Sequence, residues 1–120
     1  MPQNTISQNS NREAELEYAL ITQRGIIGRL LCVKDTNTLN QELLNLNSDL
    51  FIDSKYKLIF EYIIKHIKEN KSIPSYDLIC KKINVTKDLL IHCLSNSDSA
   101  SDKERISALK KTNTKLKLQS

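Results

Sequence analysis

Apolar residues recur every three or four positions along most of this chain, and short polar stretches separate one such run from the next. The clearest run starts after Asp53 or Ser54, either of which can cap a helix N-terminus, and it ends at residues 69–72. Its apolar positions are Tyr56, Ile59, Phe60, Ile63 and Ile67. This spacing predicts an amphipathic helix, and the repeated pattern limits the chain to a fold built from packed helices.

Further runs predict helices on both sides of this one. The first begins at Ser10 and contains Gly25 and Gly28, which allow either one long helix with close packing at the glycines or a break near Gly25. Further helices are expected at residues 38–46, 75–83, 86–94 and 102–118. With only two glycines and two prolines, a turn-rich all-β fold is excluded. We therefore predict an all-α fold, a compact bundle of about five short-to-medium helices plus a protruding C-terminal helix, the first arm of a helical hairpin.

Short polar side chains indicate where several of these helices begin. A serine or threonine before the first turn accepts a hydrogen bond from a backbone N–H, and a glutamate three residues later completes a capping box. The predicted N-caps are Ser75 and Thr86, and the predicted capping boxes are Ser10 with Glu13 and Ser101 with Glu104.

The chain is long enough for one hydrophobic core. Residues 1–10 lack apolar periodicity and are predicted to be disordered, residues 11–100 to form the globular domain, and residues 101–120 a basic C-terminal helix that starts a hairpin or linker. No apolar run is long enough to span a membrane, and the first residues do not resemble a secretory signal. Three cysteines without paired spacing indicate a reducing compartment, so we expect a cytoplasmic protein without membrane contact.

The net charge of +4 is confined to the end of the chain. Residues 1–100 carry 12 basic and 12 acidic groups, whereas residues 101–120 carry six basic and two acidic groups. Such a segment can be the solvated face of a terminal helix, or it can contact phosphate weakly and without sequence specificity. The candidate phosphate contacts are Lys110, Lys111, Lys115 and Lys117.

No set of residues has the spacing that catalysis or metal binding requires. His92, Cys93 and Cys80 lack a fourth zinc ligand and the paired spacing of zinc sites. Gly25 and Gly28 match the GxxG of KH domains, but that module needs strands, and helices are predicted on both sides. No glycine-rich nucleotide loop is present. We expect this chain not to be an enzyme and to have no catalytic, cofactor-binding or metal site.

The last predicted helix has a narrow apolar stripe, which is typical of a seam between two helices. The stripe consists of Ile106, Leu109, Asn113 and Leu116. A helical hairpin needs two helices, and only the first is predicted here, so Ile106, Leu109 and Leu116 are expected to lie partly exposed. The sequence therefore predicts weak self-association, or a partner, at this seam.

Residues 48–83 resemble the N-terminal domain of DnaB-type replicative DNA helicases. An acidic residue and Phe lead into a long helix with an Ile-Phe pair, and a Pro opens the next short helix. The matching residues are Asp49, Phe51, Asp53, Ile59, Phe60 and Pro74. The core anchors of the family pattern among them are Phe51, Ile59, Phe60 and Pro74. Upstream, residues 26–31 look like the family's apolar first helix, and Ser99-Ala100 followed by Ile106 is similar to the small-residue loop before its helical hairpin.

Several positions depart from that pattern. Tyr56 stands where the family usually has His, Ile52 where it usually has Tyr, and the Gly before Pro74 is absent. Residues 11–23 also extend the first helix, so the chain would be a divergent member.

A second family is similar. The C-terminal helicase-binding domain of DnaG-type primases resembles residues 23–27 (Gln-Arg-Gly-Ile-Ile) and the Asp49-x-Phe51 start. Pro74 and the Ser99-Ala100 loop favour the helicase.

The helicase resemblance implies a non-catalytic interaction and oligomerisation domain in DNA replication, a primosome component that forms a collar and contacts primase or a helicase loader. The parent protein would be an ATP-dependent helicase, or a primase if the second resemblance holds, in which case the partner is a helicase ring. A stand-alone regulator that mimics the collar is a third alternative. A weak homodimer is expected from the seam.

Overall fold

The computed structural model describes residues 2–97 and 100–119, and it describes side chains for residues 12–97 and 100–114. The helices are α1 (Pro2–Cys32), α2 (Gln41–Leu44), α3 (Ser54–Asn70), α4 (Tyr76–Ile83), α5 (Lys87–Ser95) and α6 (Asp102–Gln119), and the 3₁₀ turns are η1 (Thr36–Thr38) and η2 (Ser48–Leu50). The described residues contain no strand. The predicted all-α fold is confirmed.

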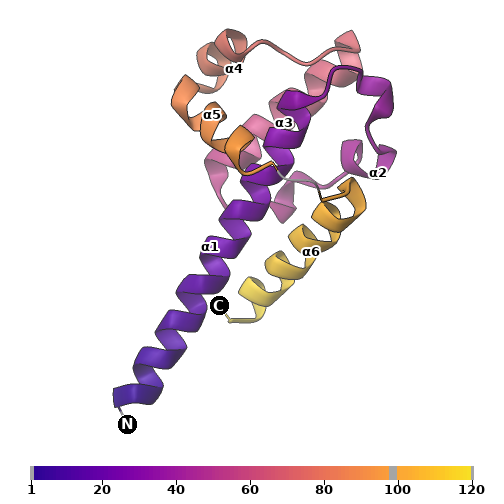
Figure 1. The fold of residues 1–120 in the computed structure, drawn as a ribbon. Coiled ribbons are helices and arrows are strands. Elements are labelled where there is room, and N and C mark those ends of the chain that lie inside the picture. The colour runs from indigo at the N-terminus through magenta and orange to yellow at the C-terminus, as the bar shows by residue number, and fades with distance from the viewer. Residues whose placement is uncertain (1, 98–99, 120) are drawn as a thin grey trace.

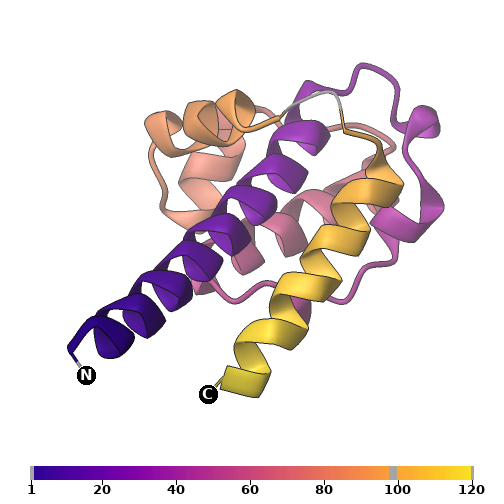
Figure 2. The same cartoon turned by 60° about the horizontal axis from the view of Figure 1, so that its bottom comes forward.

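The helices surround α1, which is the longest of them (Figure 1). Helices α4 and α5 pack on one side of it, α2 lies on the other, and α6 runs beside it in both views (Figures 1 and 2). The start of α6 meets the end of α1, where Arg29 Nε donates to Asp102 Oδ1 at 3.0 Å, so the two helices are antiparallel. The molecule measures 56 × 28 × 24 Å, and its long dimension comes from the N-terminal turns of α1, which extend past the other helices (Figure 1). It is α1 that projects, whereas α6 is packed along it.

The predicted caps of α3, α4 and α5 are confirmed. Asp53 accepts hydrogen bonds from the backbone N–H groups of the first turn of α3, and Ser75 and Thr86 do the same for α4 and α5. Ser101 Oγ accepts from the Glu104 backbone N–H at 3.2 Å and donates to its carboxylate at 3.1 Å. Local side chains thus determine where these helices begin.

Helix α1 begins at Pro2 and includes Ser10 as an interior residue, so Ser10 does not cap it. The structure therefore continues the helix through most of the segment predicted to be disordered. A proline at the first helical position loses no hydrogen bond, and no glycine interrupts residues 2–24. The helix also passes through Gly25 and Gly28 without a break, which confirms the alternative of one long helix packed closely at its glycines.

The two glycines are where α1 touches its neighbours most closely. A Cβ atom on Gly28 would lie 2.2 Å from the carbonyl oxygen of Cys93 in α5. A Cβ on Gly25 would lie 3.2 Å from the carbonyl oxygen of Asn96 and 3.1 Å from Nη1 of Arg105. The missing side chain at Gly28 therefore sets the distance between α1 and α5.

The core lies between α1, α3, α5 and α6. The rings of Phe51 and Phe60 stack with centroids 4.7 Å apart and an interplanar angle of 28°. The remaining anchors, Ile59 and Pro74, are also buried. All four of these residues are therefore part of the packed interior. None of the described helices is long and apolar enough to cross a membrane.

Thiol labelling should distinguish the cysteines. Cys93 is fully buried, and burial raises the pKa of its thiol to about 11, whereas Cys32 is exposed. Because the thiolate is the reactive form, we expect an aromatic disulfide reagent at about pH 8 to react with Cys32 first and with Cys93 only after unfolding. Equal reaction of all three thiols in the native and the urea-unfolded chain would contradict this packing.

Candidate functional site

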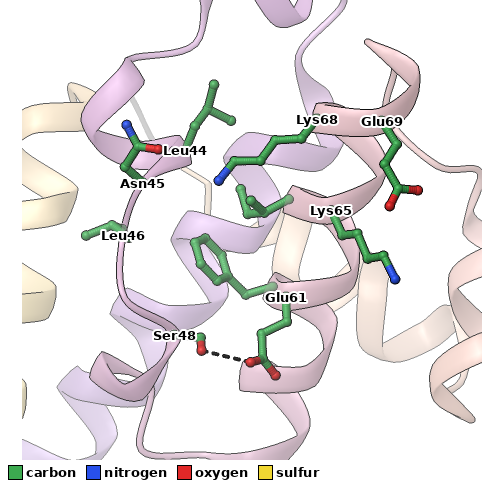
Figure 3. Close-up of a pocket in the computed structure, with 10 residues that line it drawn as sticks. Leu44, Asn45, Leu46, Ser48, Glu61, Lys65, Lys68 and Glu69 are labelled. Carbon is green, nitrogen blue, oxygen red and sulfur yellow. Dashed lines mark hydrogen bonds between the residues drawn. The ribbon is translucent and has the colours of Figure 1, made fainter.

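A cleft of about 450 Å³ lies between α3 and the segment that joins α2 to η2 (Figure 3). Leu44, Phe60 and Ile64 form its apolar floor, and each is nearly or fully buried. Its polar rim consists of Asn45, Ser48, Glu61, Lys65, Lys68 and Glu69. An apolar floor with a polar rim is the usual composition of a protein-interaction surface.

Local hydrogen bonds hold the walls of the cleft in place. The Asn40 and Asn47 side chains accept from backbone N–H groups and cap α2 and η2. Ser48 Oγ donates to Glu61 Oε2 at 2.9 Å (Figure 3), which joins η2 to α3 across the cleft. Lys57 Nζ also lies 2.8 Å from Asp49 Oδ1, and this ion pair with its hydrogen bond raises the pKa of Lys57. The short α2–η2 wall is thus attached to the rigid α3 helix.

The rim carries both signs of charge. Lys68 extends toward Leu44 and Asn45 on the opposite wall, whereas Lys65 and Glu69 point away from that wall (Figure 3). An occupant that inserts an apolar side chain above Phe60 would meet the Lys68 ammonium beside it. The cleft is therefore suited to a peptide with an apolar anchor and an adjacent acidic or carbonyl group.

The described residues contain no group of three or more His, Cys, Asp or Glu that could hold a metal ion. Two residues of the incomplete zinc set named above also lie in different surroundings. Cys93 is buried in the core, whereas His92 is exposed. Among the side chains that line the cleft, Ser48 is hydrogen-bonded to Glu61, and this contact joins the two walls.

The seam predicted on the last helix is covered by the chain itself. Ile106, Leu109 and Asn113 are 2%, 0% and 4% exposed, and Asn113 Nδ2 donates to the Leu50 carbonyl at 3.1 Å. The expectation that the seam lies partly exposed is therefore wrong for Ile106 and Leu109. Helix α1 is long enough to lie along α6, so it takes the place of a second hairpin arm. The side chain of Leu116 lies outside the described residues.

The basic residues of α6 do not gather on one described face. Lys110 Nζ lies 3.5 Å from Glu42 Oε1 of α2, while Lys111 lines a hollow beside α1. The side chains of Lys115 and Lys117 lie outside the described residues. Lys110 and Lys111 thus point to different neighbours, and one of the two is already in an ion pair.

The sequence analysis missed the polar contacts between α1 and its neighbours. Arg105, which is buried, donates from Nη1 to the Gly25 carbonyl at 3.4 Å. Gln23 Oε1, also buried, accepts from the Asp53 backbone N–H at 3.2 Å. The Arg29–Asp102 contact raises the pKa of Arg29 through its hydrogen bond to Asp102. The cleft was not predicted, because no local signal pairs the α3 residues that line it with α2.

No family model, curated protein or solved structure matches this chain.

Proposed function

We propose that this chain is a non-catalytic protein-interaction domain of the replicative helicase type, which contacts primase or a helicase loader at the cleft of Figure 3. The observation that supports this is where the cleft lies. Phe60 belongs to the segment that resembles the helicase family, stacks on Phe51 and lines the cleft floor. The stretch that resembles the helicase family thus forms one wall of this cleft.

The cleft would bind by burying one or two apolar side chains of a partner. Phe60 and Ile64 supply the apolar floor, and of the two rim lysines of α3 Lys68 extends toward the opposite wall, whereas Lys65 points away from it. Apolar burial would give most of the affinity, while the rim charges set the orientation and the rate of encounter.

A second candidate is the helicase-binding domain of a primase. The covered seam of α6 favours it, because Ile106 and Leu109 are buried in this chain and do not serve a dimer. A domain of this kind would act as a monomeric ligand of a helicase ring. The same cleft is available to either partner.

Reversing two rim charges should weaken binding. We expect Lys65→Glu/Lys68→Glu to reduce affinity for the true partner at least about tenfold, because the rim beside Lys68 changes from positive to negative and would repel the acidic group proposed for the partner. The control is Lys81→Glu/Lys82→Glu, which makes the same charge change at two exposed lysines of α4. Biolayer interferometry would use immobilised primase, loader and hexameric helicase from the same organism as the chain.

The pattern of binding separates the two candidates. Binding to primase or loader supports the helicase collar, and binding to the helicase ring supports the primase domain. If none of the three proteins binds the folded chain, the proposed function is wrong. Equal loss of binding in both double variants would mean that net charge acts, and that the cleft is not the contact site.

A further inference from the structure

A hollow of about 180 Å³ lies between η1, α2 and the end of α3. It adjoins the cleft of Figure 3, because Leu44 and Lys68 line both, and Lys68 extends toward the Leu44 wall in that figure. Its floor is apolar, since Leu44 and Ile67 are buried. Pockets that hold whole ligands measure about 300–1,000 Å³, so this hollow has room for one small chemical group.

Hydrogen bonds hold the walls of this hollow in place. Thr36 Oγ1 donates to the Lys71 carbonyl at 3.1 Å, which joins η1 to the end of α3. Asp35 caps η1, and its carboxylate accepts from the Asn37 backbone N–H at 3.0 Å. Asp35 itself does not line the hollow. The walls are therefore formed before any ligand arrives.

The groups that line the hollow supply positive charge and hydrogen-bond donors. Lys68 and Lys71 provide two ammonium groups, and Asn37 and Gln41 add carboxamide N–H donors. The lining that the structure describes includes no Asp or Glu, so nothing in it offsets the two charges. Within the described part of the chain neither ammonium is in a salt bridge, whereas Lys57 of the same helix is. The hollow is thus suited to an anion.

The backbone of Lys71 has a conformation that is unusual for a lysine. It ends α3 in the left-handed region, with φ 58° and ψ 28°, where glycine or asparagine is common. The other described non-glycine residue with positive φ is Asn84, which follows that preference. A Cβ atom makes this conformation costly. Glycine at position 71 would fit the backbone better, but it would remove an ammonium group from the hollow.

We propose that this hollow binds a phosphate monoester group. Such a group carries a charge of about −1.5 to −2 at pH 7 and three acceptor oxygens, which match two ammonium groups and the carboxamide donors. A carboxylate carries a single negative charge and would leave one ammonium uncompensated. The phosphate can belong to a free phosphate ester or to a phosphorylated side chain of a partner. The proposal does not rest on the helicase or primase assignment, and Lys71 does not line the cleft of Figure 3.

Inorganic phosphate is the first probe. In an NMR titration of the ¹⁵N-labelled full chain at constant ionic strength, the amide signals of Thr36, Asn37, Gln41 and Lys71 should shift and saturate. Acetate should bind at least about fivefold more weakly than phosphate. Lys71→Gln should also weaken phosphate binding at least about fivefold, because it removes one ammonium and keeps a long polar side chain. The control Lys82→Gln, at an exposed lysine of α4, should bind like the unmodified chain. Absence of saturable shifts, equal affinity for acetate, or equal effects of the two variants would overturn the proposal.

Glycine at position 71 separates binding from folding. Lys71→Gly should lose phosphate binding and yet melt at an equal or higher temperature in circular dichroism, because it relieves the left-handed backbone. Asn84→Gly changes the corresponding position of α4 and should keep phosphate binding. Retained binding in Lys71→Gly, or equal loss in Asn84→Gly, would contradict a site at Lys71.

A phosphopeptide distinguishes the two sources of the phosphate. The peptide has a leucine beside its phosphoserine, so that the leucine can reach the adjoining cleft. Binding at least about tenfold tighter than inorganic phosphate, and lost in the unphosphorylated peptide, would identify a phosphorylated side chain of a partner. Equal binding of the peptide and inorganic phosphate would identify a free phosphate ester. Peptide binding that does not change on removal of the phosphate would overturn the proposal.

Discussion

Replacing Gly28 with alanine should destabilise the chain by roughly 3 kcal/mol or more, although alanine favours a helix interior by about 1 kcal/mol over glycine. The added Cβ would lie 2.2 Å from the Cys93 carbonyl oxygen and 2.9 Å from its carbonyl carbon. Both are backbone atoms of α5, so the contact is relieved only if the two helices move apart. The helices would then lose packing around Ile27 and Cys93, which are fully buried.

Gly25→Ala is the matched control for this prediction. It gives the same gain in helix propensity on the same helix, but its Cβ would meet Arg105 Nη1 and the Asn96 carbonyl oxygen at 3.1 and 3.2 Å. A side-chain end can shift by a few tenths of an ångström, so we expect a change within about 1 kcal/mol. Urea unfolding followed by circular dichroism measures both variants. If Gly28→Ala is as stable as Gly25→Ala, α1 and α5 are not in the contact described.

The features that the sequence predicts correctly, helix caps and the apolar side of a helix, depend on residues close together in the chain. Asp53, Ser75 and Thr86 act on N–H groups two or three positions away; the roles of Ser75 and Thr86 were predicted, and Asp53 was one of the two candidates for α3. The α3 stripe that contains Ile59 and Phe60 was also correct, because one period of 3.6 residues determines which side of a helix is apolar.

What could not be predicted depends on which helix lies next to which. The narrow stripe of α6 predicts a seam between helices, but its described residues are buried inside the same chain, where α6 contacts α1, α2 and η2. The spacing of Ile106 and Leu109 contains no information about the partner. A local pattern can also mislead. Ser10 and Glu13 match a capping box, but the helix does not begin there and continues to Pro2. The cleft of Figure 3 likewise joins Leu44 to Lys68 through tertiary packing alone.

Leu109→Asp should unfold the chain or detach α6, with a loss of several kcal/mol. Leu109 is fully buried beside Ile106, so the substitution places a carboxylate in an apolar site without a partner. The free energy of unfolding of a domain of this size is about 5–15 kcal/mol, so the expected loss is a large fraction of it. Far-ultraviolet circular dichroism and sedimentation velocity should therefore show lower helicity and an expanded or aggregated species.

Ser107→Asp provides the comparison on the same helix. Ser107 is exposed, so the same charge should leave the helicity of the chain nearly unchanged. The pair of variants decides between an internal and an intermolecular seam, because a charge at an intermolecular seam dissociates the assembly and leaves each subunit folded. If Leu109→Asp turned a dimer into a fully helical monomer, α6 would belong to an interface between copies, as the sequence alone suggested. If it unfolds the monomer, the α6 stripe belongs to the core of the single chain, and the cleft beside Phe60 remains as a surface for another protein.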